Sequence, residues 1–268
     1  MGGLNGNTLQ YKTTMIEQRS LEWKRQRLGF ITASEFYNLM KNHKEEIPMT
    51  DEELENYKLE HPSARKVPTT KKVDAPFSDA TFTYLDRKIM ERYIPKNGAD
   101  EEYLLFHDIP NKAMMYGTDN ESSARMCYAE RMGYEVLEVG FIPLDGYEKF
   151  CGVSSDGIVR YENGGVELKC PFYIEHHVEN LLMQNWSDLL DLRPEYYWQV
   201  RLNMLAWDTE WWDFVSFCPF VAPSNQLKVL RIYRDIEIDN EIKKRLDLAV
   251  SYIKKRMNQI KNTPTIIK

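Results

Sequence analysis

Three charged residues near the middle of the chain have the types and spacing for hydrolytic chemistry. Asp156 is followed, after ten residues, by Glu167-Leu168-Lys169. Glu167 and Lys169 are two positions apart, so on a strand their side chains point to one face. Carboxylate oxygens are preferred ligands of Mg²⁺ and Mn²⁺, and such an ion can activate water beside a phosphate. The spacing therefore predicts a metal site with a basic group beside it. A surface hairpin with a cross-strand salt bridge is the alternative.

The turn between these residues decides whether they can share a metal. A tight turn at Asn163-Gly164 would leave Asp156 about four residues, or ~13 Å, from Glu167 along the sheet. A shared metal instead requires Asp156 to lie nearly opposite Glu167 or Lys169, with the loop centred near Tyr161-Glu162. We predict this second register.

Two helices can bring further polar groups to such a site. A helix is expected over 111–132, closed by Gly133, with Glu121 on its apolar face. Either the carboxylate of Glu121 points toward Asp156, or it is simply solvated at the end of the helix. A second, aromatic helix over 195–207 places Tyr196 and Gln199 on one face together with Asn203 and Ala206.

The N-terminal part offers a candidate phosphate site. A helix over 16–30 should end near Gly29, and Thr32 with Glu35 has the spacing of a capping box for a second helix. Hydroxyl groups at a helix N-terminus beside arginines could bind a phosphate. Alternatively, the helix is an ordinary capped amphipathic helix, with Arg27 paired to Glu22 or another acid of its own helix. The phosphate-binding candidates are Arg25, Arg27, Thr32 and Ser34.

Composition limits the class of protein. The chain has 268 residues, of which 43% are hydrophobic, and a net charge of −6, so a DNA ligand would require basic residues gathered on one surface. No apolar run approaches the ~20 residues of a membrane span. Residues 1–14 lack the apolar core of a signal peptide and are expected to be mobile. The four cysteines contain no C-x-x-C pair, which disfavours a zinc ribbon or an iron–sulfur cluster. We expect a cytoplasmic protein with reduced thiols and no membrane partner.

Hydrophobic periodicity predicts helices that alternate with groups of strands. The segment 41–76 is charged, interrupted by Pro and poor in large apolar residues, so we interpret it as an insertion with a short helix followed by irregular chain. The order of elements indicates one α/β (α+β) domain over 1–268, with a central mixed sheet flanked by helices. Besides those above, the expected helices span 51–60, 78–93, 175–183 and a final one capped by Asp239 and running to Ile260. The expected strands span 134–142, 149–153, 156–161, 165–170, 210–218 and 228–238.

Four motifs together give a resemblance. They are W-K-R-Q-R-L-G-F-I-T-A-S-E (23–35), Y-G-T-D-N-E-S-S-A-R (116–125), S-S-D-G through G-G-V-E-L-K-C-P (154–171) and Y-Y-W-Q-V-R-L-N-M (196–204). In this order they resemble the lambda-exonuclease family of phage recombination nucleases, also called YqaJ-like viral recombinases. The resemblance covers most of the chain and implies a PD-(D/E)XK restriction-endonuclease-like core.

The resemblance also implies roles for individual residues. Asp156 and Glu167 match metal ligands, the backbone carbonyl of Leu168 matches a further ligand, and Glu121 matches the helix carboxylate that supports a second metal. The expected cofactors are two ions of Mg²⁺ or Mn²⁺.

The other matched residues would act on water and on DNA. Lys169 matches the lysine that orients or activates the attacking water, and Gln199 matches a glutamine near that water. Arg27, Ser34 and Ser154 match a pocket for a 5′-phosphate. Tyr196, one turn before Gln199, belongs to the DNA-contacting candidates.

The implied activity is 5′→3′ digestion of one strand of linear double-stranded DNA to mononucleotides. The 3′ single strands left behind would serve phage-type recombination with a single-strand annealing protein, and the implied assembly is a homotrimeric ring. The alternatives are a RecB-like or Cas4-like repair nuclease and a DNA-end-binding accessory protein without catalysis. Two features depart from the family pattern: Ser155 replaces the usual Pro before Asp156, and the 41–76 segment is longer than in the lambda enzyme.

Overall fold

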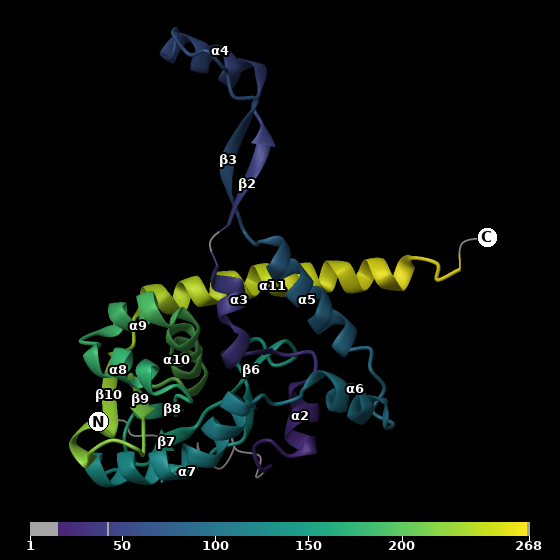
Figure 1. Cartoon of the computed structure of the whole chain (residues 1–268). Helices are drawn as coiled ribbons and strands as arrows, with labels where there is room; N and C mark the ends of the chain where they lie inside the picture. The colour runs from purple at the N-terminus through teal and green to yellow at the C-terminus, as the bar shows by residue number, and fades with distance from the viewer. Residues whose placement is uncertain (1–15, 42, 267–268) are drawn as a thin grey trace.

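The computed structural model describes residues 16–41 and 43–266, so our expectation for 1–14 lies outside the described residues. Figure 1 shows a mixed α/β body, a long helix across it and an arm that projects from it. The helices are α2 (Leu21–Arg27), α3 (Tyr37–Met40), α4 (Asp51–Glu60), α5 (Asp79–Glu91), α6 (Ala99–His107), α7 (Lys112–Met132), α8 (Ile174–Leu182), α9 (Trp186–Leu192), α10 (Pro194–Trp207) and α11 (Ile236–Asn262). The strands are β1 (Ile31–Thr32), β2 (His43–Pro48), β3 (Thr70–Ala75), β4 (Val136–Leu137), β5 (Phe141–Pro143), β6 (Cys151–Ser154), β7 (Gly157–Val159), β8 (Gly164–Lys169), β9 (Trp211–Phe217) and β10 (Leu227–Tyr233).

A five-stranded sheet forms the centre of the body, in the order β10-β9-β8-β7-β4. Its strands pair antiparallel except for β8 and β9, which run parallel. Parallel neighbours need a crossover, and α8, α9 and α10 provide it. The expected central mixed sheet flanked by helices is therefore confirmed.

Alternating side chains of this sheet build two separate cores. On one face, Val166 and Leu168 of β8 pack with Ala124 and Tyr128 of α7. On the other face, Trp212 and Phe214 of β9 belong to a larger core that includes α10 and α11. The sheet is consequently held between α7 and α10, and both helices carry candidate site residues.

Two consecutive glycines allow the close packing of β8 on β9. Gly164 lies opposite Trp211 and Gly165 opposite Trp212 in the parallel register. A Cβ on either glycine would overlap the indole ring of its partner. These glycines therefore belong to the strand and not to the turn before it.

A smaller sheet, in the order β1-β6-β5, joins the N-terminal part to the body. Residues 31–32 were expected to start a helix, but they pair in parallel with β6. Thr32 makes no side-chain cap bond; its hydroxyl donates to Glu35 Oε2 at 3.1 Å, and the expected helix is replaced by a 3-10 turn, Ala33–Glu35, and the four-residue α3. The end of the preceding helix near Gly29 is confirmed, because Gly29 has the left-handed φ of 75°.

The insertion is more regular than the sequence indicated. Its helix α4 has the predicted bounds of 51–60, but the chain after it forms β3, which pairs antiparallel with β2. The pair and its helix make the arm in Figure 1. Runs of charged residues in HKEEIP and TKKVDA hid these strands, since neither face of the ribbon is part of the core and no hydrophobic alternation is required.

Some helix boundaries and faces also differ from the prediction. The final helix begins at Ile236, since Asp235 accepts a bond from the backbone N–H of Glu237, and Asp239 lies buried in its first turn. β10 accordingly ends at Tyr233. The helix expected over 78–93 ends at Glu91, and Tyr93 beyond it is 45% exposed.

Candidate active site

The hairpin of β7 and β8 has the register that a shared site requires. Gly157 pairs with Val166 and Val159 with Gly164, which brings Asp156 opposite Glu167. The backbone N–H of Leu168 donates to Asp156 Oδ2 at 2.7 Å. The predicted register is confirmed.

Glu167 is fully buried and points toward α10. Its Oε1 accepts from Lys169 Nζ at 2.6 Å and its Oε2 from Asn203 Nδ2 at 2.9 Å. Lys169 Nζ also donates to Gln199 Oε1 at 3.2 Å and lies 4.7 Å from the ring centre of Tyr196. The β8 strand and one face of α10 thus form a connected polar group, in which Glu167 and Lys169 share a face as their two-residue spacing predicted.

The electrostatics of this group follow from burial and like charges. Burial raises the pKa of Asp156 well above its ordinary value, and the nearby charges of Glu167 and Glu121 raise it further. Burial alone would lower the pKa of Lys169, but the carboxylates of Glu167 and Asp156 outweigh it and raise that pKa. The site therefore holds a charged lysine and a carboxyl group short of positive partners.

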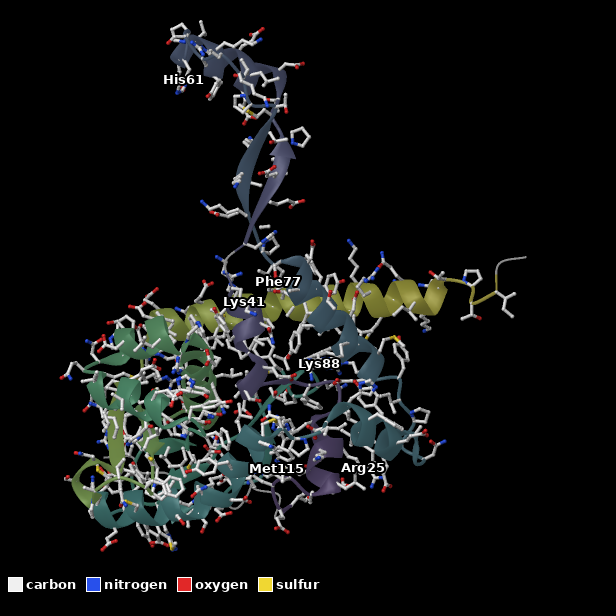
Figure 2. The ribbon with its side chains drawn as sticks, in the orientation of Figure 1. Arg25, Lys41, His61, Phe77, Lys88 and Met115 are labelled. Carbon is white, nitrogen blue, oxygen red and sulfur yellow. The ribbon has the colours of Figure 1, made fainter. Side chains whose placement is uncertain are left out.

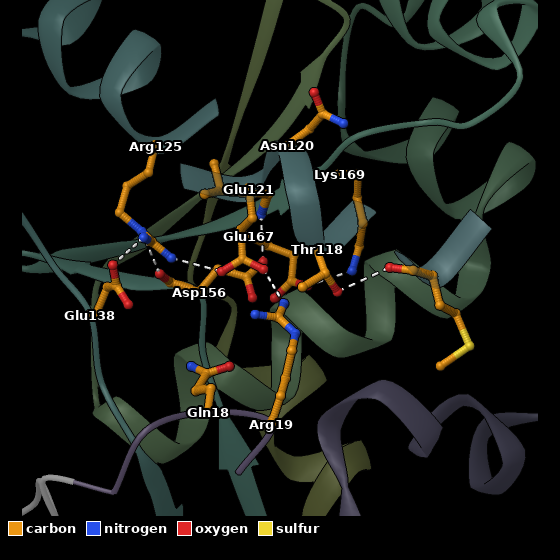
Figure 3. A network of polar contacts seen from close by, with 12 residues as sticks. Gln18, Arg19, Thr118, Asn120, Glu121, Arg125, Glu138, Asp156, Glu167 and Lys169 are labelled. Atoms are coloured by element: carbon orange, nitrogen blue, oxygen red, sulfur yellow. Dashed lines mark hydrogen bonds and ion pairs between the residues drawn. The ribbon is translucent and has the colours of Figure 1, made fainter. Parts of the chain in front are cut away.

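Glu121 reaches the same site from α7. Arg125, one turn later, donates from Nη2 to Glu121 Oε1 at 2.7 Å, and Arg19 forms an ion pair with Oε2. Arg125 also donates to the backbone oxygen of Asp156 at 3.2 Å and pairs with Glu138. Figure 3 shows Arg19 and Arg125 approaching the carboxylates from different sides. The reading of Glu121 as merely solvated is wrong, because the residue is buried.

A second group of predicted residues lies around Arg27, in the N-terminal part of the chain. Arg27 Nη2 is 3.4 Å from Ser34 Oγ, and its guanidinium lies 4.0 Å from the ring centre of Trp23. Burial lowers the pKa of Arg27. The expected alternative, a pair with Glu22, is not among its contacts in the described part of the chain.

Ser154 and Ser155 are tied to indole groups on both sides of the chain. Trp23 Nε1 donates to Ser154 Oγ at 3.0 Å, and Trp207 Nε1 donates to Ser155 Oγ at 3.0 Å. Ser155 stands where the family pattern has a proline. Its hydroxyl, which proline lacks, accepts the bond from Trp207 and so holds the backbone just before Asp156.

One cleft of about 620 Å³ brings most of these residues together. Arg25 is the exception: it does not line the cleft, and its Nε binds the buried Asp100 of α6 at 2.7 Å. The structure therefore does not bring Arg25 together with the other phosphate-site candidates. The predicted residues that line the cleft are Arg27, Thr32, Ser34, Glu121, Ser154, Asp156, Glu167, Leu168, Lys169, Tyr196 and Gln199.

The carboxylate oxygens in this cleft are suitable ligands for a hard divalent cation. They surround the buried carboxyl group of Asp156, whose raised pKa shows that its negative charge lacks sufficient positive partners. Within the described residues, however, no three His, Cys, Asp or Glu side chains form a ready ligand cluster. In the same part of the chain, arginines hold both oxygens of Glu121, and Lys169 and Asn203 hold those of Glu167.

Two residues of this group, Arg125 and Arg19, were not predicted, whereas Asn203 had been placed only on the same helix face as Gln199. Arg125 lies four positions after Glu121, so helical spacing could have indicated it. Arg19 had no such signal, because its contact with Glu121 joins segments about a hundred positions apart.

The sheet, the helices on its two faces and the acidic residues at the β7–β8 hairpin define a PD-(D/E)XK-like fold. The chain belongs to the YqaJ-like viral recombinase family, whose domain profile matches residues 22–210. No curated protein matches the chain.

Solved structures confirm the fold. An alkaline exonuclease from Laribacter hongkongensis, LHK-Exo, is similar with a TM-score of 0.63 and 24% identity over 90% of this chain and 96% of that one. LHK-Exo in complex with dAMP has the same TM-score and coverage at 25% identity. A phage-related exonuclease from Haemophilus somnus 129PT has a TM-score of 0.56 and 12% identity, covering 86% and 96% of the two chains.

Proposed function

We propose that this protein is a metal-dependent 5′→3′ exonuclease that degrades one strand of linear double-stranded DNA from its ends. The observation that carries the proposal is the single cleft that joins Glu121, Asp156, Glu167 and Lys169 to Arg27 and Ser34. Membership of the viral recombinase family and the likeness to alkaline exonucleases support a nuclease that acts on DNA. The dAMP found with LHK-Exo is the kind of mononucleotide that such a reaction would release.

Asp156, Glu167, Glu121 and the Leu168 carbonyl would hold one or two Mg²⁺ or Mn²⁺ ions. When bound, the ions would make water more nucleophilic and neutralise charge that develops on the phosphate. Lys169, kept as an ammonium by its carboxylate neighbours, would donate a hydrogen bond to the attacking water and orient it. Gln199 Oε1 accepts a second hydrogen bond from the ammonium of Lys169, besides the one that Glu167 accepts.

Arg27 would select the strand end. It is a partly buried guanidinium whose described contacts are a hydroxyl group and an indole ring, so it retains donors for an anion. A terminal 5′-phosphate carries one more charge than an internal one, and Arg27, Ser34 and Ser154 line the cleft that also contains Asp156. Binding of that phosphate would place the first phosphodiester bond at the carboxylates.

The remaining expectations fit the same proposal. A protein of this activity would work in the cytoplasm on phage or prophage DNA, as a ring of three copies that encloses the duplex, together with a single-strand annealing protein. In the described part of the chain, no helix combines the length and apolar character needed to cross a bilayer.

The test uses blunt duplexes that carry either a 5′-phosphate or a 5′-hydroxyl, with Mg²⁺ or with a chelator. The wild-type protein should release mononucleotides only with the metal, and faster from the phosphorylated end. Arg27→Ala should lose the preference for that end, whereas Asp156→Asn should release none. Equal rates of release by the wild-type protein from both kinds of end would contradict the proposed 5′-phosphate pocket. Binding of duplex ends without release of mononucleotides would indicate a non-catalytic end-binding protein.

A further inference from the structure

Arg19 occupies a position that the proposed metal chemistry leaves without a role. It precedes α2 and, in the described part of the chain, forms its ion pair with Oε2 of Glu121. The other oxygen of Glu121 is held by Arg125 at 2.7 Å. Both oxygens of this carboxylate are therefore covered by cations of the chain itself (Figure 3).

The two arginines differ in how firmly they are held. Arg125 has three partners, namely Glu121, Glu138 and the backbone oxygen of Asp156, and its side chain is 12% exposed. The side chain of Arg19 is 43% exposed. Arg19 can consequently move into solvent, while Arg125 stays and keeps the carboxylate oriented.

The backbone around Arg19 is set for this contact. Arg19 has a φ of 70°, in the left-handed region that costs free energy for a residue with a Cβ. Its neighbour Gln18 fixes the segment by donating to the backbone oxygens of Val139 and Ser155, at 2.8 and 2.9 Å. The segment is thus pinned next to Asp156, and the guanidinium of Arg19 is directed at the carboxylates.

We infer that Arg19 is a tethered counter-cation, a positioning residue that neutralises Glu121 in the metal-free protein and yields its place to a divalent cation. When Arg19 leaves, Oε2 of Glu121 becomes a free ligand, and Arg125 still holds Oε1. The contact keeps the acidic cleft charge-balanced before the metal arrives and makes metal binding compete with a residue of the chain. The inference rests on the metal dependence proposed above, but not on the direction of digestion.

The experiment measures metal affinity without DNA and without turnover. Mn²⁺ is titrated calorimetrically into the metal-free full-length protein, into Arg19→Gly and into Arg19→Lys, and the melting temperature of each is recorded with and without Mn²⁺. Glycine removes the guanidinium and accepts the left-handed backbone freely. Lysine retains the charge. Lys24→Ala removes one positive charge from the same segment, where Lys24 pairs with Asp108 at 3.0 Å outside the cleft.

The dissociation constant for Mn²⁺ should become roughly two- to fivefold lower in Arg19→Gly, because the ion no longer displaces a partly exposed ion pair. The rise in melting temperature caused by Mn²⁺ should grow accordingly. Arg19→Lys and Lys24→Ala should bind like the wild type.

Weaker or unchanged binding in Arg19→Gly, while the wild type binds Mn²⁺, would overturn the counter-cation and leave the proposed function intact. An equal gain in Lys24→Ala would also overturn it, because the effect would then come from net charge alone. If neither the wild type nor Arg19→Gly binds Mn²⁺, the proposed metal dependence is contradicted, and with it the role of Arg19 as a counter-cation.

Discussion

At the scale of single residues, Lys169 is held by two acceptors that fix its ammonium group. Glu167 Oε1 is 2.6 Å away and Gln199 Oε1 is 3.2 Å away. The negative charges of Glu167 and Asp156 raise its pKa, so the group remains protonated and acts as a hydrogen-bond donor. A donor of this kind can orient water without removing its proton, which leaves activation of the water to the proposed cations.

Lys169→Ala should therefore reduce the rate of nucleotide release by roughly a hundredfold or more while duplex binding persists. Stability should fall as well, because the fully buried Glu167 loses its positive partner. Because the pKa of Lys169 is raised in the folded state, its charge contributes fully to the free energy of unfolding at all pH values below the ordinary lysine pKa of about 10.4. That contribution is lost only as the pH rises through the pKa of the folded state. The loss measured by thermal unfolding should therefore not shrink between pH 6 and pH 9, because the lysine stays charged and the carboxyl groups it stabilises are at least as ionised at the higher pH.

A suitable control is Lys228→Ala. Lys228 donates to the backbone oxygen of Leu181 at 3.1 Å and does not line the cleft. Its replacement should leave nucleotide release unchanged. Normal release by Lys169→Ala would contradict the role given to that lysine.

At the scale of elements, the position of the site depends on how β8 lies against β9. The backbone of Gly164 and Gly165 allows Trp211 and Trp212 to pack against β8. Because β8 carries Glu167 and Lys169, the same contact sets how these side chains face α10. Site and core are coupled through this strand pair.

Gly165→Ala should lower the free energy of unfolding by about 1–3 kcal/mol, since the added methyl group overlaps the ring of the fully buried Trp212. Denaturant or thermal unfolding measures the change. The matched control is Gly117→Ala in α7, where a Cβ meets nothing within 4 Å and helix propensity favours alanine. This control should be neutral or slightly stabilising. Equal stability of the two variants would mean that the strand pair adapts without cost.

At the scale of the whole molecule, the arm of β2, α4 and β3 is separate from the body that carries the site. Its strands pair with each other from His43–Ala75 at the base to Pro48–Thr70. Figure 2 places His61 at the far end of the arm, and Lys41 and Phe77 where it joins the body. None of the cleft-lining residues comes from the arm.

Deletion of residues 43–75, with a short Gly-Ser bridge, should leave the body folded, because His43 and Ala75 are already neighbours. The free energy of unfolding should change by less than about 1 kcal/mol, and far-ultraviolet circular dichroism should report the remaining helices. Release of nucleotides from short duplexes should persist, as the cleft is intact. Loss of the folded state would show that the arm stabilises the body.

The sequence by itself determined much of this protein. The requirement of a shared site predicted Asp156 nearly opposite Glu167 or Lys169, and the structure has Asp156 opposite Glu167. Helix α7 ends before Gly133 as predicted, because a left-handed glycine is a local signal, and it begins one residue later than predicted, after the N-cap Asn111. The motifs also indicated correctly that both α7 and α10 contribute to the site, since helical periodicity fixes which residues share a face.

Only the tertiary structure decided the partners of these residues. Pairing with β6 turned residues 31–32 into a strand, although the local pattern favoured a helix start. Arg25 and Arg27 are two positions apart, yet Asp100 of α6 binds the first and Ser34 lies beside the second. The contact of Arg19 with Glu121 joins segments that no local pattern relates. Ion pairs of this kind depend on which surfaces the packed elements bring together, because a charged side chain binds the nearest partner in space and not in sequence.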